Sequence, residues 1–165
     1  MPRVVLVNPL IPPNTGNIAR TCAATDTDLH LVGPLGFQLS DRHLKRAGLD
    51  YWPYVKLFVH ESWPAFRKAQ QTLGGRCIGF STSGRCNYIK LNFYPDDWLL
   101  FGSETEGLSS EVLAACDQTA FIPMIGQHVR SLNLSVSTAI GLFEALRQTN
   151  QLKCANPPKG RNQSR

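Results

Sequence analysis

Short apolar segments alternate along this chain with segments of helical pattern, and this alternation limits the folds that it can adopt. The segment Arg3–Asn8 (RVVLVN) is a nearly continuous apolar run rich in β-branched residues, as in a parallel strand covered on both faces. The other strands predicted on these grounds are Leu29–Gly33, Val55–His60, Cys77–Ser81, Trp98–Phe101 and Thr119–Ile122. We therefore expect an α/β fold with one mostly parallel sheet of about five or six strands and helices on both faces.

Start and stop signals predict the helices between these strands. Pro9, Pro12 and Pro13 are taken to exclude helix from the loop after the first strand, so the first helix should begin at a cap on Asn14 or Thr15. Further helices are expected from Ser40 to Ala47, from Trp63 to Leu73, from Ser109 or Ser110 to Ala115, and from about Leu134 to Gln148.

Helical spacing also predicts which side chains point inward. The expected inward stripe is Ile18, Cys22 and Ala23 in the first helix, and Val136, Ala139, Ile140, Phe143 and Leu146 in the last. Gly141 lies inside the last helix, where glycine costs about 1 kcal/mol relative to alanine. Close packing against another backbone or another subunit would explain its presence.

The basic charge of the chain is concentrated at its end. The 165 residues have a formal net charge of +5, and residues 153–165 contain four basic residues and no acid, so residues 1–152 carry only about +1. The composition predicts one domain over residues 1–152 and a basic, disordered tail over residues 153–165. The tail could contact phosphates or simply be solvated, and both interpretations stay open from sequence.

Several classes of protein are disfavoured by what the sequence lacks. No stretch approaches the roughly 18 apolar residues of a membrane span, and the apolar run Val4–Val7 is too short for a signal peptide. The five cysteines include no Cys-x-x-Cys pair, and the four histidines form no ligand pair at helical spacing, so we expect free thiols, no metal and a cytoplasmic protein. Without a G-x-G-x-x-G fingerprint or a P-loop, a dehydrogenase or an NTPase is disfavoured.

Polar, glycine-containing loops follow three of the predicted strands, where α/β proteins bind their ligands. Gly102 and Gly107 would let the backbone approach a flat ring or a ribose closely, although taken alone they favour a plain strand-to-helix turn, since glycine turns are common. Asn133 or Ser135 is expected to cap the last helix. Arg20 follows the first loop on the strand-end side of the sheet, where it could bind a phosphate. It could equally be a solvated surface arginine without a function.

Taken together, these loops resemble a known family. Pro12–Arg20 (PPNTGNIAR), Phe101–Leu108 (FGSETEGL), and Ile122–Met124 followed by Ser131–Ser135 (SLNLS) are similar, in order, to the three motifs of the SpoU/TrmH group. That group belongs to the SPOUT superfamily of RNA methyltransferases. Arg46–Tyr51 (RAGLDY) also matches, and the resemblance extends from residue 3 to about residue 150.

This resemblance implies a fold and an activity. The fold would carry a C-terminal trefoil knot, an exception to the rule against knotted chains. The protein would be a homodimer that uses S-adenosylmethionine. The small TrmL-type members of the group methylate the ribose 2′-hydroxyl of the tRNA wobble nucleotide, position 34. The resemblance therefore implies that the substrate is tRNA, in the first place leucine tRNA.

The same resemblance implies roles for individual residues. The cofactor contacts would be Phe80, Gly102, Ile122, Ser131 and Leu132. The reacting end would be lined by Asn14, Asn17, Arg20, Glu104, Ser131 and Asn133. Arg20 would assist loss of the hydroxyl proton, and Asn14 and Asn133 would orient the ribose and the loops. No metal is required for this chemistry.

Two residues depart from the usual motif, and other functions remain open from sequence alone. Ser103 stands where proline or asparagine is common, and Glu106 stands where TrmL-like relatives frequently carry arginine, so the RNA contacts of that loop are expected to differ. One alternative is 2′-O-methylation of another tRNA position or of ribosomal RNA. Another is a knotted RNA-binding domain without catalysis, but that function does not require Arg20 and Asn133, which are both present.

Overall fold

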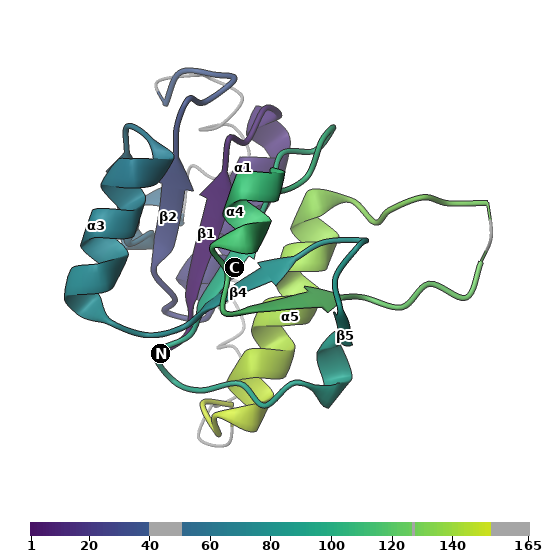
Figure 1. The fold of residues 1–165 in the computed structure, drawn as a ribbon. Helices are drawn as coiled ribbons and strands as arrows, with labels where there is room; N and C mark the ends of the chain where they lie inside the picture. Colours follow the sequence, from purple (N-terminus) through teal and green to yellow (C-terminus); the bar gives the residue numbers. More distant parts are fainter. Residues whose placement is uncertain (40–50, 127, 153–165) are drawn as a thin grey trace, which may run out of the picture.

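One sheet of parallel strands organises the molecule (Figure 1). The computed structural model describes residues 1–39, 51–126 and 128–152. The sheet has seven strands in the order β3-β2-β1-β6-β4-β7-β5. Their bounds are Arg3–Val7 (β1), Leu29–Val32 (β2), Leu57–His60 (β3), Cys77–Phe80 (β4), Cys86–Asn87 (β5), Trp98–Phe101 (β6) and Gln118–Phe121 (β7). Every pairing between these strands is parallel, so their carboxyl ends meet at one edge of the sheet.

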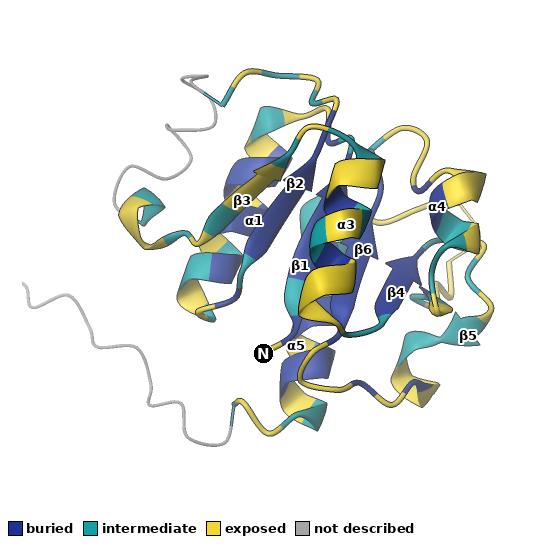
Figure 2. Ribbon diagram, turned by 60° about the vertical axis from the view of Figure 1, so that its left-hand side comes forward, coloured by how far each residue is buried: buried dark blue, intermediate teal, exposed yellow. Residues whose placement is uncertain are grey.

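Helices cover both faces of the sheet, as predicted. Their bounds are Pro12–Ala24 (α1), Trp63–Leu73 (α3), Ser110–Ala114 (α4) and Leu134–Gln148 (α5), with short 3-10 helices at Trp52–Tyr54 (η1) and Tyr88–Lys90 (η2). Alternate residues of β1 point to opposite faces. Val4 and Leu6 pack with α1 and α5, whereas Val5 and Val7 pack with α3 and α4. The central strands are therefore buried on both sides (Figure 2).

The start of α1 differs from the prediction. The helix begins at Pro12, with Ile11 as the N-cap residue, and Asn14 and Thr15 lie inside it. The first N–H groups of a helix have no intrahelical partner, so Pro12 and Pro13 lose no hydrogen bond there and their fixed φ suits the helix. The consequence is that the Asn14 side chain is buried and is not used as a cap.

The inward face of α5 also differs from the prediction, although its bounds agree. Val136 and Phe143 are 47% and 45% exposed. The buried residues of the helix are Thr138, Gly141, Leu142, Ala145 and Leu146. The inward stripe is therefore shifted around the helix, and an apolar strip that includes Val136 and Phe143 is left on its outer surface.

Gly141 is explained by packing against aromatic side chains of the same chain, where close approach to another backbone or a subunit was predicted. A Cβ at this position would lie 2.8 Å from Cζ of Phe80 and 3.2 Å from Cζ of Phe101. These two rings are stacked with centroids 4.7 Å apart. Glycine thus lets α5 lie directly on the ring pair at the carboxyl ends of β4 and β6.

The two-residue strand β5 was not predicted, and it forms the edge of the sheet beside β7. The side-chain amide of Gln148 on α5 fixes the segment that follows β5 in the sequence. Its Oε1 accepts a hydrogen bond from the N–H of Phe93 at 2.9 Å, and its Nε2 donates one to the carbonyl of Leu91 at 2.9 Å. The helix predicted from Ser40 to Ala47 lies outside the described residues. Among the described residues, no helix is long and apolar enough to cross a membrane.

Candidate active site at the carboxyl edge of the sheet

The loop after β6 closes on itself through two glycines. The N–H of Gly107 donates to the carbonyl of Ser103 at 2.9 Å, and the N–H of Ser103 donates to the carbonyl of Gly107 at 3.2 Å. A Cβ on Gly102 would overlap the carbonyl group of Gly107, and Gly107 itself has a φ of 72°. The space beside Gly102 is thus filled by the loop's own backbone, and the compact loop presents residues 103–106 at its rim.

This loop forms one wall of a cavity of about 210 Å³. The other walls come from the ends of β4 and β7 and from the segment that leads into α5. All five residues predicted to bind the cofactor line this cavity: Phe80, Gly102, Ile122, Ser131 and Leu132. The neighbouring strands β6, β4 and β7 bring them together, because their carboxyl ends lie side by side.

A chain of polar side chains connects the cavity wall to both flanking helices. Glu104 accepts hydrogen bonds from the N–H of Leu10 at 2.8 Å, the N–H of Ile11 at 3.2 Å and Nδ2 of Asn14 at 3.1 Å. Oδ1 of Asn14 in turn accepts from Nδ2 of Asn133 at 3.0 Å. Three segments about 30 to 120 residues apart in sequence are therefore fixed together at the carboxyl edge of the sheet.

Asn133 performs two functions with one side chain. Its Oδ1 caps α5, because it accepts from the N–H of Ser135 at 2.8 Å and from the Ser135 hydroxyl at 2.7 Å. Its Nδ2 remains free to bind Asn14. The cap predicted from sequence is thus Asn133, and the start of α5 is tied to α1 through the same residue.

Comparison with known proteins identifies this arrangement. The profile of the SpoU rRNA Methylase family matches residues 1–143. This chain belongs to the SpoU methylase family. The resemblance stated from the three loop motifs is therefore confirmed.

Two relatives cover nearly all of the family domain. A Synechocystis protein is 57% identical over 152 residues, covering 92% of this chain and 99% of that protein, and its name, tRNA (cytidine(34)-2'-O)-methyltransferase, carries a provisional qualifier. A Polaromonas protein with the same name and no qualifier is 47% identical over 148 residues, covering 88% of this chain and 89% of that protein.

Two solved structures show the same fold. One, described as giving insight into the 2-OH methylation of C/U34 on tRNA, superposes with a TM-score of 0.86 at 50% identity and covers 90% of this chain and 95% of that one. An AdoMet-bound rRNA methyltransferase from Sinorhizobium meliloti has a TM-score of 0.80 at 28% identity, over 88% of this chain and 56% of that one.

Arg20 and Asn17, which are SpoU motif residues on α1, do not line the cavity of their own chain. Both side chains are exposed. The guanidinium carbon of Arg20 lies 5.5 Å from the ring centroid of Tyr51, and the Tyr51 hydroxyl donates to the carbonyl of Gly16 at 2.7 Å. The ring is fixed to α1 and holds Arg20 at the helix surface, more than one turn beyond Asn14.

The charges around the cavity are mostly acidic. Glu104 and Glu106 lie on its rim together with one guanidinium, that of Arg130. Sequence analysis did not assign a role to Arg130, nor to Ser81 and Thr82, which also line the cavity. Ser81 is the last residue of the predicted strand Cys77–Ser81 and directly follows the observed β4, so its position at a strand end was the available signal. Among the described residues, no group of three or more potential ligands could hold a metal ion.

Proposed function

We propose that this protein transfers a methyl group from S-adenosylmethionine to the ribose 2′-hydroxyl of nucleotide 34 of tRNA. The observation that carries this proposal is the polar chain Glu104–Asn14–Asn133, which borders the cavity where every predicted cofactor residue is found. The SpoU relatives and the solved structure that names C/U34 methylation support the target position.

The cavity suits the chemistry of this cofactor. S-adenosylmethionine supplies a methyl group activated by a sulfonium cation. Phe80, Ile122 and Leu132 offer apolar surface for an adenine ring, and Gly102 and Ser131 offer backbone and hydroxyl groups for polar edges. The carboxylates of Glu104 and Glu106 favour a cationic ligand, and Arg130 is available to a carboxylate. The AdoMet-bound rRNA methyltransferase structure supports this assignment.

The polar chain would position the acceptor. A ribose hydroxyl is a weak nucleophile, so in-line placement against an activated methyl group supplies much of the rate. Asn14 and Asn133, held by each other and by Glu104, orient the ribose and the two loops. Arg20 assists loss of the hydroxyl proton, and Asn17, beside it on the exposed face of α1, contacts the RNA.

We further propose that the protein works as a homodimer, and that Arg20 acts in the partner's cavity. The outer strip of α5 exposes Val136 and Phe143, and the connection between β7 and α5 exposes Ile125 and Val129. Figure 1 shows that this connection extends away from the body of the molecule. A second copy packed on these apolar surfaces would bury them and could receive an Arg20 that its own chain leaves outside the cavity.

The remaining proposals concern the chain path and the substrate. The family resemblance supports a trefoil knot formed by the segment that leads into α5, leucine tRNA as the preferred substrate, and a cytoplasmic location. Two alternatives are methylation of another tRNA position or of ribosomal RNA, and RNA binding without catalysis.

The test is methyl transfer from labelled S-adenosylmethionine to unmodified leucine tRNA, followed by alkaline hydrolysis. A 2′-O-methyl group protects its phosphodiester, so one alkali-resistant dinucleotide beginning at nucleotide 34 is the expected product. Label in another dinucleotide or only in ribosomal RNA would refute the proposed target. Cofactor binding with no transfer to any RNA would refute catalysis.

A further inference from the structure

A second concavity runs along the edge strand β5, apart from the cofactor cavity. We call it the β5 groove; it has a volume of about 800 Å³ and includes Arg76, Arg85, Lys90, Tyr94 and Asp117 in its lining. The turn after β4 separates the two sites, because Ser81 and Thr82 line the cofactor cavity whereas Ser83 lines the groove. A ligand that extends from one site across this turn reaches the other.

Two cations of the groove have no partner in the part of the fold that the structure describes. Within the described ranges, the basic side chains without any ion pair, hydrogen bond or ring contact are Lys68, Arg85, Lys90 and Arg130. Two of these four, Arg85 and Lys90, lie in this one groove and both are exposed. By contrast, the charged residues among the described lining of the cofactor cavity are two carboxylates, which repel phosphate, and one arginine.

The remaining charges of the groove are already satisfied. Asp97 is fully buried and accepts two hydrogen bonds from Arg76, at 3.0 and 2.8 Å, which neutralise that guanidinium. Oδ2 of Asp117 accepts the N–H of Cys77 at 2.7 Å. Asp117, the one carboxylate among the described lining residues of the groove, is thus engaged with the backbone.

An aromatic ring completes the surface. Tyr94 is half exposed, and the guanidinium carbon of Arg76 lies 4.0 Å from its ring centroid. Asp97 fixes both residues, since its Oδ2 also accepts the N–H of Tyr94 at 2.8 Å. Cations beside a prepositioned aromatic ring are the elements with which proteins bind single-stranded nucleic acid.

We propose that the β5 groove binds the substrate RNA beyond the reacting nucleotide, with Arg85 and Lys90 on backbone phosphates and Tyr94 stacked on a base. This inference rests on the proposed function only for the identity of the RNA. The unpaired nucleotides of an anticodon loop present both the phosphates and the free bases that such a groove needs.

The decisive measurement is the affinity of unmodified leucine tRNA for the wild type and for the double variant R85A/K90A, between about 50 and 200 mM salt. We expect the double variant to bind roughly tenfold more weakly, with a salt slope smaller by about 1.4 to 1.8, as two lost phosphate contacts require. Its affinity for S-adenosylmethionine should be unchanged, because neither residue lines the cofactor cavity.

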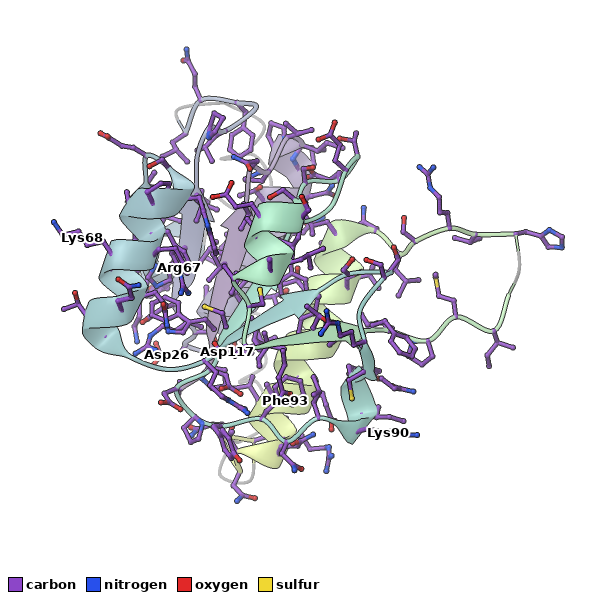
Figure 3. All side chains as sticks on the ribbon, in the orientation of Figure 1. Asp26, Arg67, Lys68, Lys90, Phe93 and Asp117 are labelled. Carbon is purple, nitrogen blue, oxygen red and sulfur yellow. The ribbon has the colours of Figure 1, made fainter. Side chains whose placement is uncertain are left out.

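Lys68→Ala is the matched control. Lys68 is also exposed and without a partner among the described side chains, but it projects from α3 on the opposite side of the molecule from Lys90 (Figure 3). It should keep the wild-type affinity and slope. Equal salt slopes for the wild type and R85A/K90A would overturn the proposal, and so would an equal loss in Lys68→Ala.

Substitution of Tyr94 tests the stacking contact separately. Tyr94→Ala should weaken binding about 5- to 160-fold with no change in salt slope, whereas Tyr94→Phe keeps the ring and should bind as the wild type does. Equal affinities for Tyr94→Ala and Tyr94→Phe would overturn the stacking role. If the proposed function failed but the groove proposal held, the wild type would not methylate nucleotide 34. The salt slope of its RNA binding would still depend on Arg85 and Lys90.

Discussion

Glu104 and Glu106 are two carboxylates on one loop, and only the first has a structural role that the contacts explain. Glu104 accepts three hydrogen bonds from the start of α1, whereas the side chain of the exposed Glu106 accepts none among the described residues. The difference follows from position alone, because the turn between Gly102 and Gly107 directs residue 104 toward α1. The motif placed Glu104 at the reacting end and marked Glu106 as a departure from the family pattern, but it did not predict that Glu104 would bind the start of α1.

Glu104→Gln should therefore impair the site and Glu106→Gln should not impair folding. The glutamine places an amide nitrogen where an acceptor is required, so we expect a loss of about 1 to 3 kcal/mol in the free energy of unfolding and at least tenfold slower methyl transfer. Glu106→Gln is the control and should unfold as the wild type does. Chemical denaturation of both variants measures the difference, and equal midpoints would contradict the role given to Glu104.

Arg20→Ala should abolish methylation while S-adenosylmethionine affinity stays within about twofold of the wild type. The reason is that Arg20 lies outside the cavity that the cofactor would occupy. Calorimetric titration with the cofactor and a single-turnover assay with tRNA measure the two properties. Lys68→Ala, another exposed cation, should retain full turnover. Unchanged turnover in Arg20→Ala would refute its catalytic role.

At the scale of elements, the sequence predicted most strands and helices, and its errors have identifiable physical causes. Six of the seven strands were predicted because buried parallel strands are apolar along their length; β5 is too short to give such a signal. The inward face of α5 was misassigned because Val136 and Phe143 are apolar but exposed, and hydrophobicity alone does not show which apolar side chains reach the core. The β5 groove was missed because its residues form no sequence motif.

The pairing of β2 with β3 creates a histidine pair that should make folding sensitive to acid. Nδ1 of His30 lies 2.9 Å from Nε2 of His60. Burial, followed by repulsion from His60 and Arg3, lowers the pKa of His30 from 6.5 to about 3. Between these values the unfolded chain binds a proton and the folded chain does not. The stabilisation is therefore complete above about pH 6.5 and is lost as the pH falls toward 3.

Urea unfolding at pH 7 and pH 5 tests this titration. We expect the wild type to lose about 2 kcal/mol more over this interval than His30→Phe, which keeps the stacking on Phe58 but cannot be protonated. The substitution removes the hydrogen bond of Nδ1, but it also removes Nε2 of His30, a buried polar atom without a partner among the described residues, and neither change depends on pH. His128→Asn, at an exposed position, should follow the wild type. Equal losses in the wild type and His30→Phe would exclude this pair as the source.

Gly141→Ala tests the packing of α5 on the ring pair. Alanine favours a helix by about 1 kcal/mol, but its Cβ would lie 2.8 Å from Phe80, and overpacking of this kind costs about 1 to 3 kcal/mol. We expect net destabilisation and weaker cofactor binding, because Phe80 also lines the cavity. Gly126→Ala is the control, since no atom lies within 4 Å of its added Cβ. A stabilised Gly141→Ala variant would contradict this packing.

For the whole molecule, the distribution of charge predicts how RNA is held. The domain has a net charge of only about +1, so its affinity for RNA depends on local groups of cations and on the basic residues after position 152. Truncation after Gln151 removes Lys153, Lys159, Arg161 and Arg165. We expect weaker tRNA binding and a salt slope reduced by up to about 3.6, with methyl transfer at saturating tRNA retained.

The tail and the β5 groove should contribute independently if they contact different phosphates. The slope lost on truncation and the slope lost in R85A/K90A would then add in the combined variant, because each phosphate contact releases its own counterions. A combined loss smaller than the sum would place both on the same phosphates, and a truncated chain with the wild-type slope would show that the tail makes no contact. Salt titrations of the four proteins on one tRNA separate these outcomes, and they report how a nearly neutral domain holds a polyanion.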